Sequence, residues 1–357
     1  MPIHQVLVGA SPGDAITREA LLLRAALRAW GPSEIYAQHI DPALVGDVLA
    51  LRELPSPGTA ALVFHLSIGD HDVLARVDAE TAPVVVRYHN VTPSSHFPHD
   101  APFAALLDLG RGALTRLAAR GGVAIADSPF NADELTAAGF GEVRVVAPLS
   151  PWPALLDVPS HLDLDHHLDV MVGGPLVLCV AQVLPHKRLD LVVAAFHLFT
   201  TYHHPDAQLV VVGAARDVSH LHSLHGLQRE LNLANVWFTG SVSDAELATC
   251  YRHADVFVTM SDHEGFCVPL VEAMAFGVPV VARATTAIPS TVGGAALLLP
   301  AEAGVTMACE ALAVVVDDRA VRTELVARGL RRADDFRPEH LAAQVLDVLG
   351  ALRPVGA

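Results

Sequence analysis

Lysine is almost absent from this 357-residue sequence, in which Lys187 is the single lysine among 23 basic residues. Positive charge as a whole is scarce, because 39 acidic residues leave a formal net charge of −16. Proteins that bind nucleic acids neutralise phosphates with clustered lysine and arginine. The charge balance therefore argues against a nucleic-acid partner.

Cysteine is also rare, and no two cysteines form a CxxC pair. This spacing argues against a disulfide framework and a cysteine zinc site, and it favours a reducing compartment, so we expect the cytoplasm. The beginning of the sequence, Met1–Gln5, lacks the basic and apolar regions of a signal peptide. The four cysteines are Cys179, Cys250, Cys267 and Cys309.

Long uninterrupted apolar runs are missing as well. The longest apolar stretch, residues 295–316, is broken by Pro300 and by acidic residues, whereas a membrane helix needs about 20 mostly apolar residues. We therefore expect no transmembrane segment. Weak contact with a membrane surface stays open, because Arg111, Arg116 and Arg120 share one predicted helix; a solvated helix face is the simpler interpretation.

Apolar residues are abundant, at 52% of the chain against 17% charged residues. Such a composition excludes a disordered chain, and the length suggests two domains. Short β-branched runs alternate with helical patterns, which indicates parallel sheets covered on both faces. We predict an α/β protein with two Rossmann-like parallel-sheet domains facing a cleft. The predicted strands are residues 5–8, 61–64, 83–86, 123–126, 143–146, 176–180, 208–212, 236–239, 255–259 and 279–282.

The domain boundary is predicted from a change of composition. Residues 148–175 contain five prolines and read as an interdomain linker. This places an N-terminal domain at residues 1–168 and a C-terminal domain at residues 169–336. A last helix, within residues 337–357, is expected to cross back to the N-terminal domain.

The most informative segment runs from Ser261 to Ala282. Gly265 allows a sharp turn after a strand, Pro269 suits the first position of a helix, and a glycine at 277 suits its C-terminal cap. The backbone N–H groups at this helix start form an anion site suited to phosphate. The residues that carry these groups are Phe266, Cys267 and Val268.

Two carboxylates frame this turn. Glu264 precedes the helix, and Glu272 follows eight residues later inside it. A carboxylate accepts two hydrogen bonds and so suits the paired hydroxyls of a sugar or a ribose. Taken singly, each glutamate is more simply a turn acid or a helix-start acid favoured by the helix dipole, but the whole constellation is far more specific.

The segment resembles the E-x7-E motif of retaining GT-B glycosyltransferases, specifically glycosyltransferase family four, whose usual form is EGFG-x-P-x-x-EAM-A-x-G-x-PVVA. The resemblance implies a GT-B fold, with a donor-binding C-terminal domain and an acceptor-side N-terminal domain. Cys267 stands where the family usually has glycine. The backbone N–H survives that change, so we expect phosphate binding to persist with a slightly different loop shape.

A second match surrounds Lys187. The family has a Gly-Arg pair, a loop and a lysine here, and the two cations neutralise the leaving diphosphate without a metal ion. This chain has Ala181-Gln182 in place of the pair, and whether Arg188 or Gln182 replaces the family's arginine stays open. An exposed solubilising lysine is the alternative for Lys187, but a chain that otherwise uses arginine favours a point-charge role on phosphate.

Weaker matches complete the resemblance. The segment with Gly240 is similar to the F-x-G-x-V turn that abuts the donor base. The loop after the first strand lacks a GxGxxG pattern; in the family its glycine, here Gly13, lets the backbone approach the donor phosphate. Asp14 follows it on the expected acceptor side.

The segment Arg87–Pro93 is similar to the YHN-x-TP segment of a bacterial subgroup of the family. The resemblance places His89 near the transferred sugar or the acceptor, with Asn90 beside it; a structural hydrogen-bonding role is the alternative for a lone histidine. For Asp127 and Ser128, before a predicted helix, we favour a capping role.

Two metal-like patterns are interpreted as incidental. Asp163 and Asp165 match a DxD metal motif but lie in the proline-rich stretch without a preceding strand. Three histidines lie on a helical stretch whose solvated face is the simpler interpretation. We expect no metal site. The three histidines are His220, His222 and His225.

The resemblance implies transfer of a hexose from a nucleotide-diphosphate sugar, UDP- or GDP-linked, to a hydroxyl of a glycan, lipid-linked or small-molecule acceptor. Retention of the anomeric configuration, no metal and no cofactor are expected. Lys187 would stabilise the diphosphate, Glu264 would hold sugar hydroxyls near the reacting face, and Glu272 would hold the ribose. A GT-B nucleotide-sugar epimerase, a sugar phosphorylase and a catalytically silent binding subunit stay as alternatives.

Overall fold

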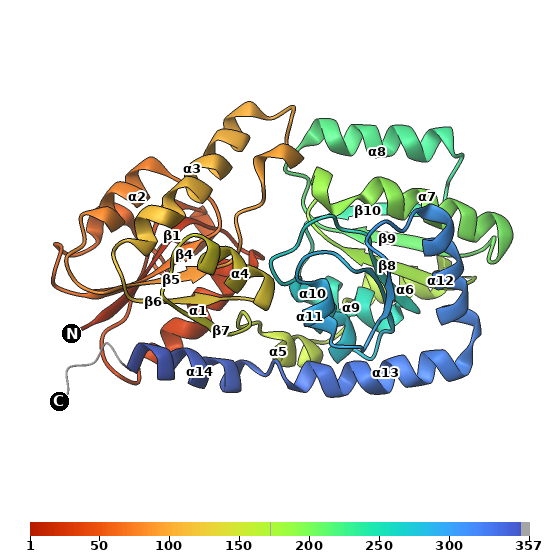
Figure 1. Cartoon of the computed structure of the whole chain (residues 1–357). Helices are drawn as coiled ribbons and strands as arrows, with labels where there is room; N and C mark the ends of the chain where they lie inside the picture. The colour runs from red at the N-terminus through yellow and green to blue at the C-terminus, as the bar shows by residue number, and fades with distance from the viewer. Residues whose placement is uncertain (172, 351–357) are drawn as a thin grey trace. The chain divides into compact units, whose positions relative to one another are not determined.

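The computed structural model describes residues 1–171 and 173–350, which form two compact units (Figure 1). The first unit contains residues up to Pro151 together with the segment that begins at Phe336. The second unit is the continuous stretch Trp152–Asp335. Each unit is built on one parallel sheet, as the alternation of apolar strands and helices predicts.

The sheet of the first unit has the strand order β3-β2-β1-β4-β5-β6-β7, with all neighbours parallel. Every residue of the central strand Ala61–Leu66 is buried, which is the signature of a strand covered on both faces. The strands are β1 (Ile3–Ala10), β2 (Ile35–Ile40), β3 (Leu49–Ala50), β4 (Ala61–Leu66), β5 (Val84–Tyr88), β6 (Val123–Ala126) and β7 (Glu142–Val145).

Helices on this sheet begin at side-chain caps. Asp14, Asp70, Asp100 and Ser128 each accept a hydrogen bond from a backbone N–H in the first helical turn. The last helix, α14, packs against α1. The helices are α1 (Ala15–Leu27), α2 (His71–Asp78), α3 (Ala101–Ala118), α4 (Pro129–Ala137) and α14 (Pro338–Gly350).

The sheet of the second unit has the order β10-β9-β8-β11-β12-β13, again parallel throughout. Its core packs strand residues such as Val177 and Val258 against Phe196 and Phe199 of α7. The strands are β8 (Leu176–Val180), β9 (Gln208–Val212), β10 (Val236–Gly240), β11 (Val256–Thr259), β12 (Val280–Arg283) and β13 (Leu297–Leu299).

The helices of the second unit cover both faces of that sheet. The one-turn 3₁₀ segment η4 (Pro185–Lys187) precedes α7 directly. The helices are α5 (Trp152–Asp157), α6 (Leu162–Met171), α7 (Leu189–Tyr202), α8 (Val218–Glu230), α9 (Asp244–His253), α10 (Val268–Ala275), α11 (Ile288–Val292), α12 (Val305–Asp317) and α13 (Arg319–Asp334).

Three strands, β2, β3 and β13, were not predicted from the sequence. In β2 polar residues interrupt the apolar pattern, as Gln38 and His39 show, while β3 and β13 are only two and three residues long. Such short or mixed runs carry too little periodicity to be recognised.

The proline-rich stretch 148–175 is not an irregular linker over most of its length. Residues 152–171 form α5 and α6, which pack against α9, and they belong to the second unit. Trp152 and Leu155 of α5 are buried, and Pro153 takes the second position of its helix, where no N–H is needed. Proline at a helix start cannot be distinguished from proline in a loop by composition alone, so the sequence pattern predicted a loop here.

The described helices include none that is long and apolar enough to cross a membrane. The three arginines of α3 are bonded within their own unit. Arg111 pairs with Glu134 at 2.8 Å, Arg116 pairs with Asp78 at 2.8 Å, and Arg120 donates to backbone carbonyls. These three arginines therefore form neither an unpaired basic face for lipid nor a face that contacts only solvent.

Candidate functional site

The turn between β11 and α10 has the expected strand–turn–helix form. α10 begins at Val268, so Pro269 takes the second helical position instead of the first. The helix ends at Ala275, and Gly277 follows the cap with a φ of +70°. The N–H of Val278 donates to the carbonyl of Ala273 at 2.9 Å, which closes the helix with a glycine-dependent motif.

Cys267 caps the start of α10 in the left-handed region, with φ +75° and ψ +72°. Glycine adopts this region freely, whereas a β-carbon there costs roughly 1–2 kcal/mol. The conformation explains why the resembling motif has glycine at this position. The loop keeps the glycine-type backbone in spite of the substitution, so the expected change of loop shape is not required.

Lys187 and Glu264 form an ion pair at the carboxyl ends of the strands β8 and β11. The Lys187 ammonium lies 2.8 Å from both carboxylate oxygens of Glu264, and the Ser261 hydroxyl donates to Glu264 Oε1 at 2.8 Å. Both pair members are largely buried, with side-chain exposures of 17% for the lysine and 9% for the glutamate. The two loops are joined further by the N–H of Asp262, which donates to the carbonyl of His186 at 2.7 Å.

Lys187 is protonated in this ion pair and therefore carries a positive charge. Burial alone would lower the pKa of Lys187, but the Glu264 carboxylate outweighs burial and raises that pKa. Burial raises the pKa of the neighbouring Cys179 thiol to about 12 and that of the Cys267 thiol well above its usual value. The thiols are therefore protonated, and the local charges are the ammonium and the carboxylate.

Glu272 lies inside α10, where its carboxylate is buried. The hydroxyl of Tyr251, in α9, donates to Glu272 Oε2 at 2.9 Å. Burial and the nearby carboxylate raise the pKa of Tyr251 well above its usual value, so the hydroxyl keeps its proton. Sequence reasoning missed Tyr251, because a tyrosine on a buried helix face carries no motif.

Arg188 has a left-handed backbone with φ +50°. Its guanidinium binds both carboxylate oxygens of Asp190, at 3.0 and 2.9 Å, and contacts Asp262 at 3.3 Å. Arg283 donates to the other oxygen of Asp262. The candidate for the missing diphosphate cation is thus part of a network of two arginines and two aspartates. Asp262 and Arg283 were not predicted, although Asp262 lies just after β11 and Arg283 is the last residue of β12.

Gly240, at the end of β10, has a φ of +71° and follows an irregularity in the pairing with β9. The carboxyl ends of parallel strands meet at one edge of a sheet, which is where α/β proteins bind ligands. The loops that follow β8, β10 and β11 therefore share one edge of the second unit. They carry Lys187, Gly240, Glu264 and the start of α10.

In the first unit, the loop after β1 is a tight turn that starts α1. Gly13 has a φ of +78°. The Asp14 carboxylate accepts hydrogen bonds from both the N–H and the hydroxyl of Thr17, each at 2.8 Å. Asp14, predicted on the acceptor side, thus has a capping function in the fold.

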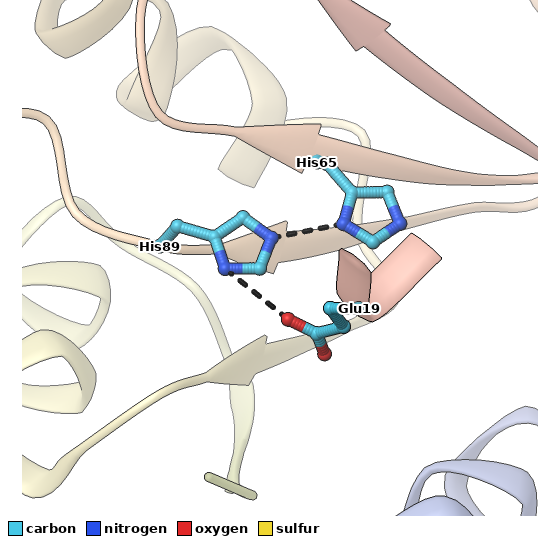
Figure 2. A group of neighbouring side chains, drawn as sticks. All are labelled: Glu19, His65 and His89. Carbon is cyan, nitrogen blue, oxygen red and sulfur yellow. Dashed lines mark hydrogen bonds and ion pairs between the residues drawn. The ribbon is translucent and has the colours of Figure 1, made fainter. Parts of the chain in front are cut away.

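His89 follows β5 (Figure 2). Its side chain is only 4% exposed. Its Nδ1 lies 2.9 Å from Asp127 Oδ2 and 3.5 Å from Glu19 Oε2. Its Nε2 lies 2.9 Å from Nδ1 of His65 in β4. Both ring nitrogens are thus engaged inside the unit in the ligand-free chain. Sequence reasoning missed Glu19 and His65, which are distant in sequence.

Arg87 supplies the second cation of this region and is completely buried. Its guanidinium lies 2.8 Å from Glu19 and 3.1 Å from Asp127, and it donates to the carbonyls of Val146 and Ala147. The carboxylates raise the pKa of Arg87 against the effect of burial. Asp127 therefore neutralises charges instead of capping α4, while Ser128 caps that helix as expected.

Asn90 has a φ of +76°, and its amide is directed into the fold. Nδ2 donates to Asn131 Oδ1 at 2.9 Å and to Glu134 Oε2 at 2.7 Å. Glu134 also accepts from the Tyr88 hydroxyl at 3.0 Å. The predicted acceptor-side asparagine thus braces β5 against α4.

The ligand-type groupings found among residues 1–171 and 173–350 are Glu19, His65 and His89, and a surface trio just after α7 and in α12. The helix α8, which carries His220 and His222, contributes to neither. The DxD pattern lies on α6, where Asp165 pairs with His253 at 2.9 Å. The surface trio is His203, Cys309 and Glu310.

The chain was compared with known protein families and with individual known proteins, and the family match falls within the second unit. The family model of glycosyl transferases group 1 matches residues 168–332. The D-inositol 3-phosphate glycosyltransferase of Kineococcus radiotolerans is 31% identical over 231 residues, which are 60% of this chain and 53% of that protein. A GDP-mannose-dependent alpha-(1-6)-phosphatidylinositol monomannoside mannosyltransferase of Mycolicibacterium smegmatis is 26% identical over 67% of this chain and 65% of its own length. The chain thus spans about half the length of the first of these relatives.

Solved structures share the fold over nearly the whole chain. Sucrose-phosphate synthase from Thermosynechococcus elongatus superposes with a TM-score of 0.78 and 20% identity, covering 99% of each chain. Anabaena HepE in complex with UDP and glucose gives a TM-score of 0.79 at 18% identity, covering 98% of this chain and all of that one. At these identities the likeness establishes the fold. Residues 168–332 thus match the glycosyl transferases group 1 family, and the two Rossmann-like units together have a GT-B fold.

Proposed function

We propose that this protein is a retaining hexosyltransferase that moves a hexose from a nucleotide-diphosphate sugar to an acceptor hydroxyl without a metal ion. The observation that carries the proposal is the buried Lys187–Glu264 ion pair beside the start of α10, within the group 1 domain. A cation fixed in a mostly buried site stabilises charge that develops on a leaving diphosphate.

In the ligand-free chain, Glu264 acts as the counter-charge of Lys187. A diphosphate would take over this role, because the ammonium offers three donors and binds phosphate as a point charge. The released carboxylate would then accept hydrogen bonds from sugar hydroxyls. Arg188 is the second cation of the proposal, and its partners Asp190 and Asp262 hold its guanidinium in place until the ligand binds.

The rest of the donor would lie on the same edge of the second unit. The amides of Phe266, Cys267 and Val268 would bind phosphate oxygens at the start of α10. Glu272 would accept from the ribose hydroxyls, with Tyr251 orienting its carboxylate. Gly240, Gly265 and their loops would approach the base and the sugar.

The acceptor is assigned to the first unit, at the loops that carry Gly13 and His89. The names of several relatives specify GDP-mannose, whereas UDP occupies a structural neighbour. GDP-mannose is therefore the first donor to test, and UDP-glucose the second. The compartment we propose is the cytoplasm, because the described cysteines are free thiols.

Donor binding and transfer test the proposal directly. The intact chain should gain thermal stability with one nucleotide sugar and give a product with retained anomeric configuration. Lys187→Ala and Glu264→Gln should each lower kcat by about 10²–10³. The matched control is Glu324→Gln, which breaks the exposed Arg328–Glu324 pair on α13 and should leave transfer unchanged.

Three outcomes contradict the proposal. Full transfer activity in the Lys187→Ala variant would show that this cation takes no part in the mechanism. Release of free nucleotide without an acceptor points to an epimerase. The absence of binding for GDP-, UDP- and ADP-sugars revives the silent binding subunit.

A further inference from the structure

A cluster of polar side chains lies buried within the first unit, at the carboxyl ends of β4 and β5, and only His89 belongs to the proposed function. We call it the histidine cluster. It joins the strands β1, β4 and β5 to α1 and to the residue that follows β6. Figure 2 shows three of its members, Glu19, His65 and His89. Its members are Gln5, Glu19, His65, Arg87, His89 and Asp127.

The side chain of Gln5 fixes the protonation of one nitrogen. Gln5 Nε2 donates to the carbonyl of Ala20 at 2.9 Å, so the amide oxygen is the atom that faces His65. His65 Nε2 lies 2.9 Å from that oxygen. Because a carbonyl oxygen only accepts, His65 Nε2 carries a proton.

The carboxylates fix a second proton. His89 Nδ1 lies 2.9 Å from Asp127 Oδ2 and 3.5 Å from Glu19 Oε2. Ionised carboxylates only accept hydrogen bonds, and Arg87 lies within 3.1 Å of both as their counter-ion. His89 Nδ1 therefore carries a proton as well.

The contact between the two rings requires a third proton. His65 Nδ1 and His89 Nε2 are 2.9 Å apart, and the rings are nearly parallel at 7°. Without a proton between them, two lone pairs would face each other in a buried site. Two neutral imidazoles carry one N–H each, so three N–H groups on two rings mean one additional positive charge.

We propose that His65 and His89 share this proton as an imidazole–imidazolium pair, and that His65 is a positioning residue that keeps the His89 ring charged and fixed at the end of β5. Only the consequence for transfer rests on the proposed function. The protonation state itself rests on the contacts of the first unit.

The charges of the cluster balance with the shared proton in place. Arg87 and the histidine pair supply two positive charges, and the Glu19 and Asp127 carboxylates supply two negative ones. Burial raises the pKa of Glu19, while Arg87 and His89 act in the opposite direction and favour its ionised form. An unbalanced charge at this depth would be costly. Burial would lower the pKa of His89, but Asp127 and Glu19 outweigh it and raise that pKa, whereas burial and two neighbouring cations hold the pKa of His65 well below its usual range. The proton thus resides mainly on His89.

A metal ion explains the same residues less well. Glu19, His65 and His89 offer ligand atoms within 4.8 Å of one another. Two histidine ligands on tetrahedral zinc, at Zn–N distances of about 2.0–2.1 Å, would hold their nitrogens further apart than 2.9 Å. The Arg87 guanidinium already neutralises Glu19. Zinc enters the test as a competing outcome.

The test is ¹⁵N NMR of the histidine rings in the full chain. At neutral pH we expect both ring nitrogens of His89 to be protonated and His65 to be a neutral Nε2–H tautomer. In His65→Phe the acceptor is lost, and the titration midpoint of His89 should fall by about one pH unit or more. In His65→Gln an amide oxygen can replace the acceptor, and the midpoint should recover. His99→Gln, at an exposed histidine, is the control.

The proposal is overturned by a neutral His89 in the wild type at neutral pH, or by displacement of the His65 and His89 resonances by one equivalent of Zn²⁺. Because the wild-type spectrum decides both points, the test survives a variant that fails to fold. Once a donor is known, His65→Phe should lower kcat more than it changes KM and shift the pH profile, with rescue by His65→Gln. Lack of any transfer would refute the proposed function but leave the NMR result intact.

Discussion

The hydroxyl of Tyr251 donates a 2.9 Å hydrogen bond to Glu272 Oε2, and this contact ties α9 to α10 through a buried carboxylate. Glu272 is the second glutamate of the motif that carries the proposed ribose contact. The position of its carboxylate therefore depends on a residue from another helix, which the motif does not include.

Removal of this hydroxyl is expected to weaken donor binding. Tyr251→Phe takes one hydrogen bond from a buried charged group, which costs about 1.5–3 kcal/mol. We expect the dissociation constant of the donor to rise about tenfold, with a smaller effect on kcat, as measured by calorimetry and initial rates. Tyr202→Phe, at a tyrosine that is 73% exposed, is the control, and equal donor affinity in both variants would contradict the role of Tyr251.

Glycine at position 267 should be better tolerated than alanine. At ordinary positions alanine is more stable than glycine by about 0.4–1 kcal/mol, because glycine has more freedom in the unfolded chain. At the φ of +75° found for Cys267 the order should reverse, since only glycine avoids the β-carbon strain. Urea denaturation of Cys267→Gly and Cys267→Ala measures this directly.

The control for this comparison is Ala119→Gly. Ala119 is exposed at the end of α3, with a φ of −64°, so glycine should destabilise the protein there. If Cys267→Ala proves more stable than Cys267→Gly, the left-handed conformation at the start of α10 is wrong.

The stability of the first unit should depend on pH through His89. Its pKa in the folded chain is raised above the ordinary 6.5, so its favourable contribution is complete below pH 6.5 and is lost as the pH rises through the higher folded-state value. The stability difference between wild type and His89→Gln should therefore shrink on going to alkaline pH, by about 1.4 kcal/mol for each unit of the shift.

Urea unfolding at a series of pH values from 6 upward measures this difference. His65 acts in the opposite range: its lowered pKa removes stability as the pH falls below 6.5, because only the unfolded chain takes up that proton. A constant difference between wild type and His89→Gln across the series would refute a charged His89.

Local sequence patterns were sufficient to predict much of the fold. Apolar runs such as residues 61–64 predict buried strands correctly, and the segment Ser261–Ala282 predicts a strand, a turn and a helix in the right places. The resemblance of the motif indicated the family that matches residues 168–332, and it indicated the GT-B fold. The stretch predicted as a linker contains the helices α5 and α6, because Pro153 marks a helix start as readily as a loop.

The partners of the site residues could not be predicted in the same way. Lys187 and Glu264 were both singled out, but their ion pair joins loops 77 residues apart. Asp262 binds both Arg188 and Arg283 through side-chain geometry that no local spacing encodes. The histidine cluster is a further case, since Glu19, His65 and His89 come together only when the sheet forms.

The packing of α14 on α1 also sets an order for the folding of the chain. The first unit consists of the residues up to Pro151 and those from Phe336 onward, while the second is continuous. During synthesis, the second unit has all its residues before Leu341, Val345 and Leu349 of α14, which are buried, have left the ribosome. The surface of α1 that contacts α14 therefore stays uncovered until the last helix has emerged. A ribosome that pauses late in this message prolongs the interval in which the first unit is incomplete.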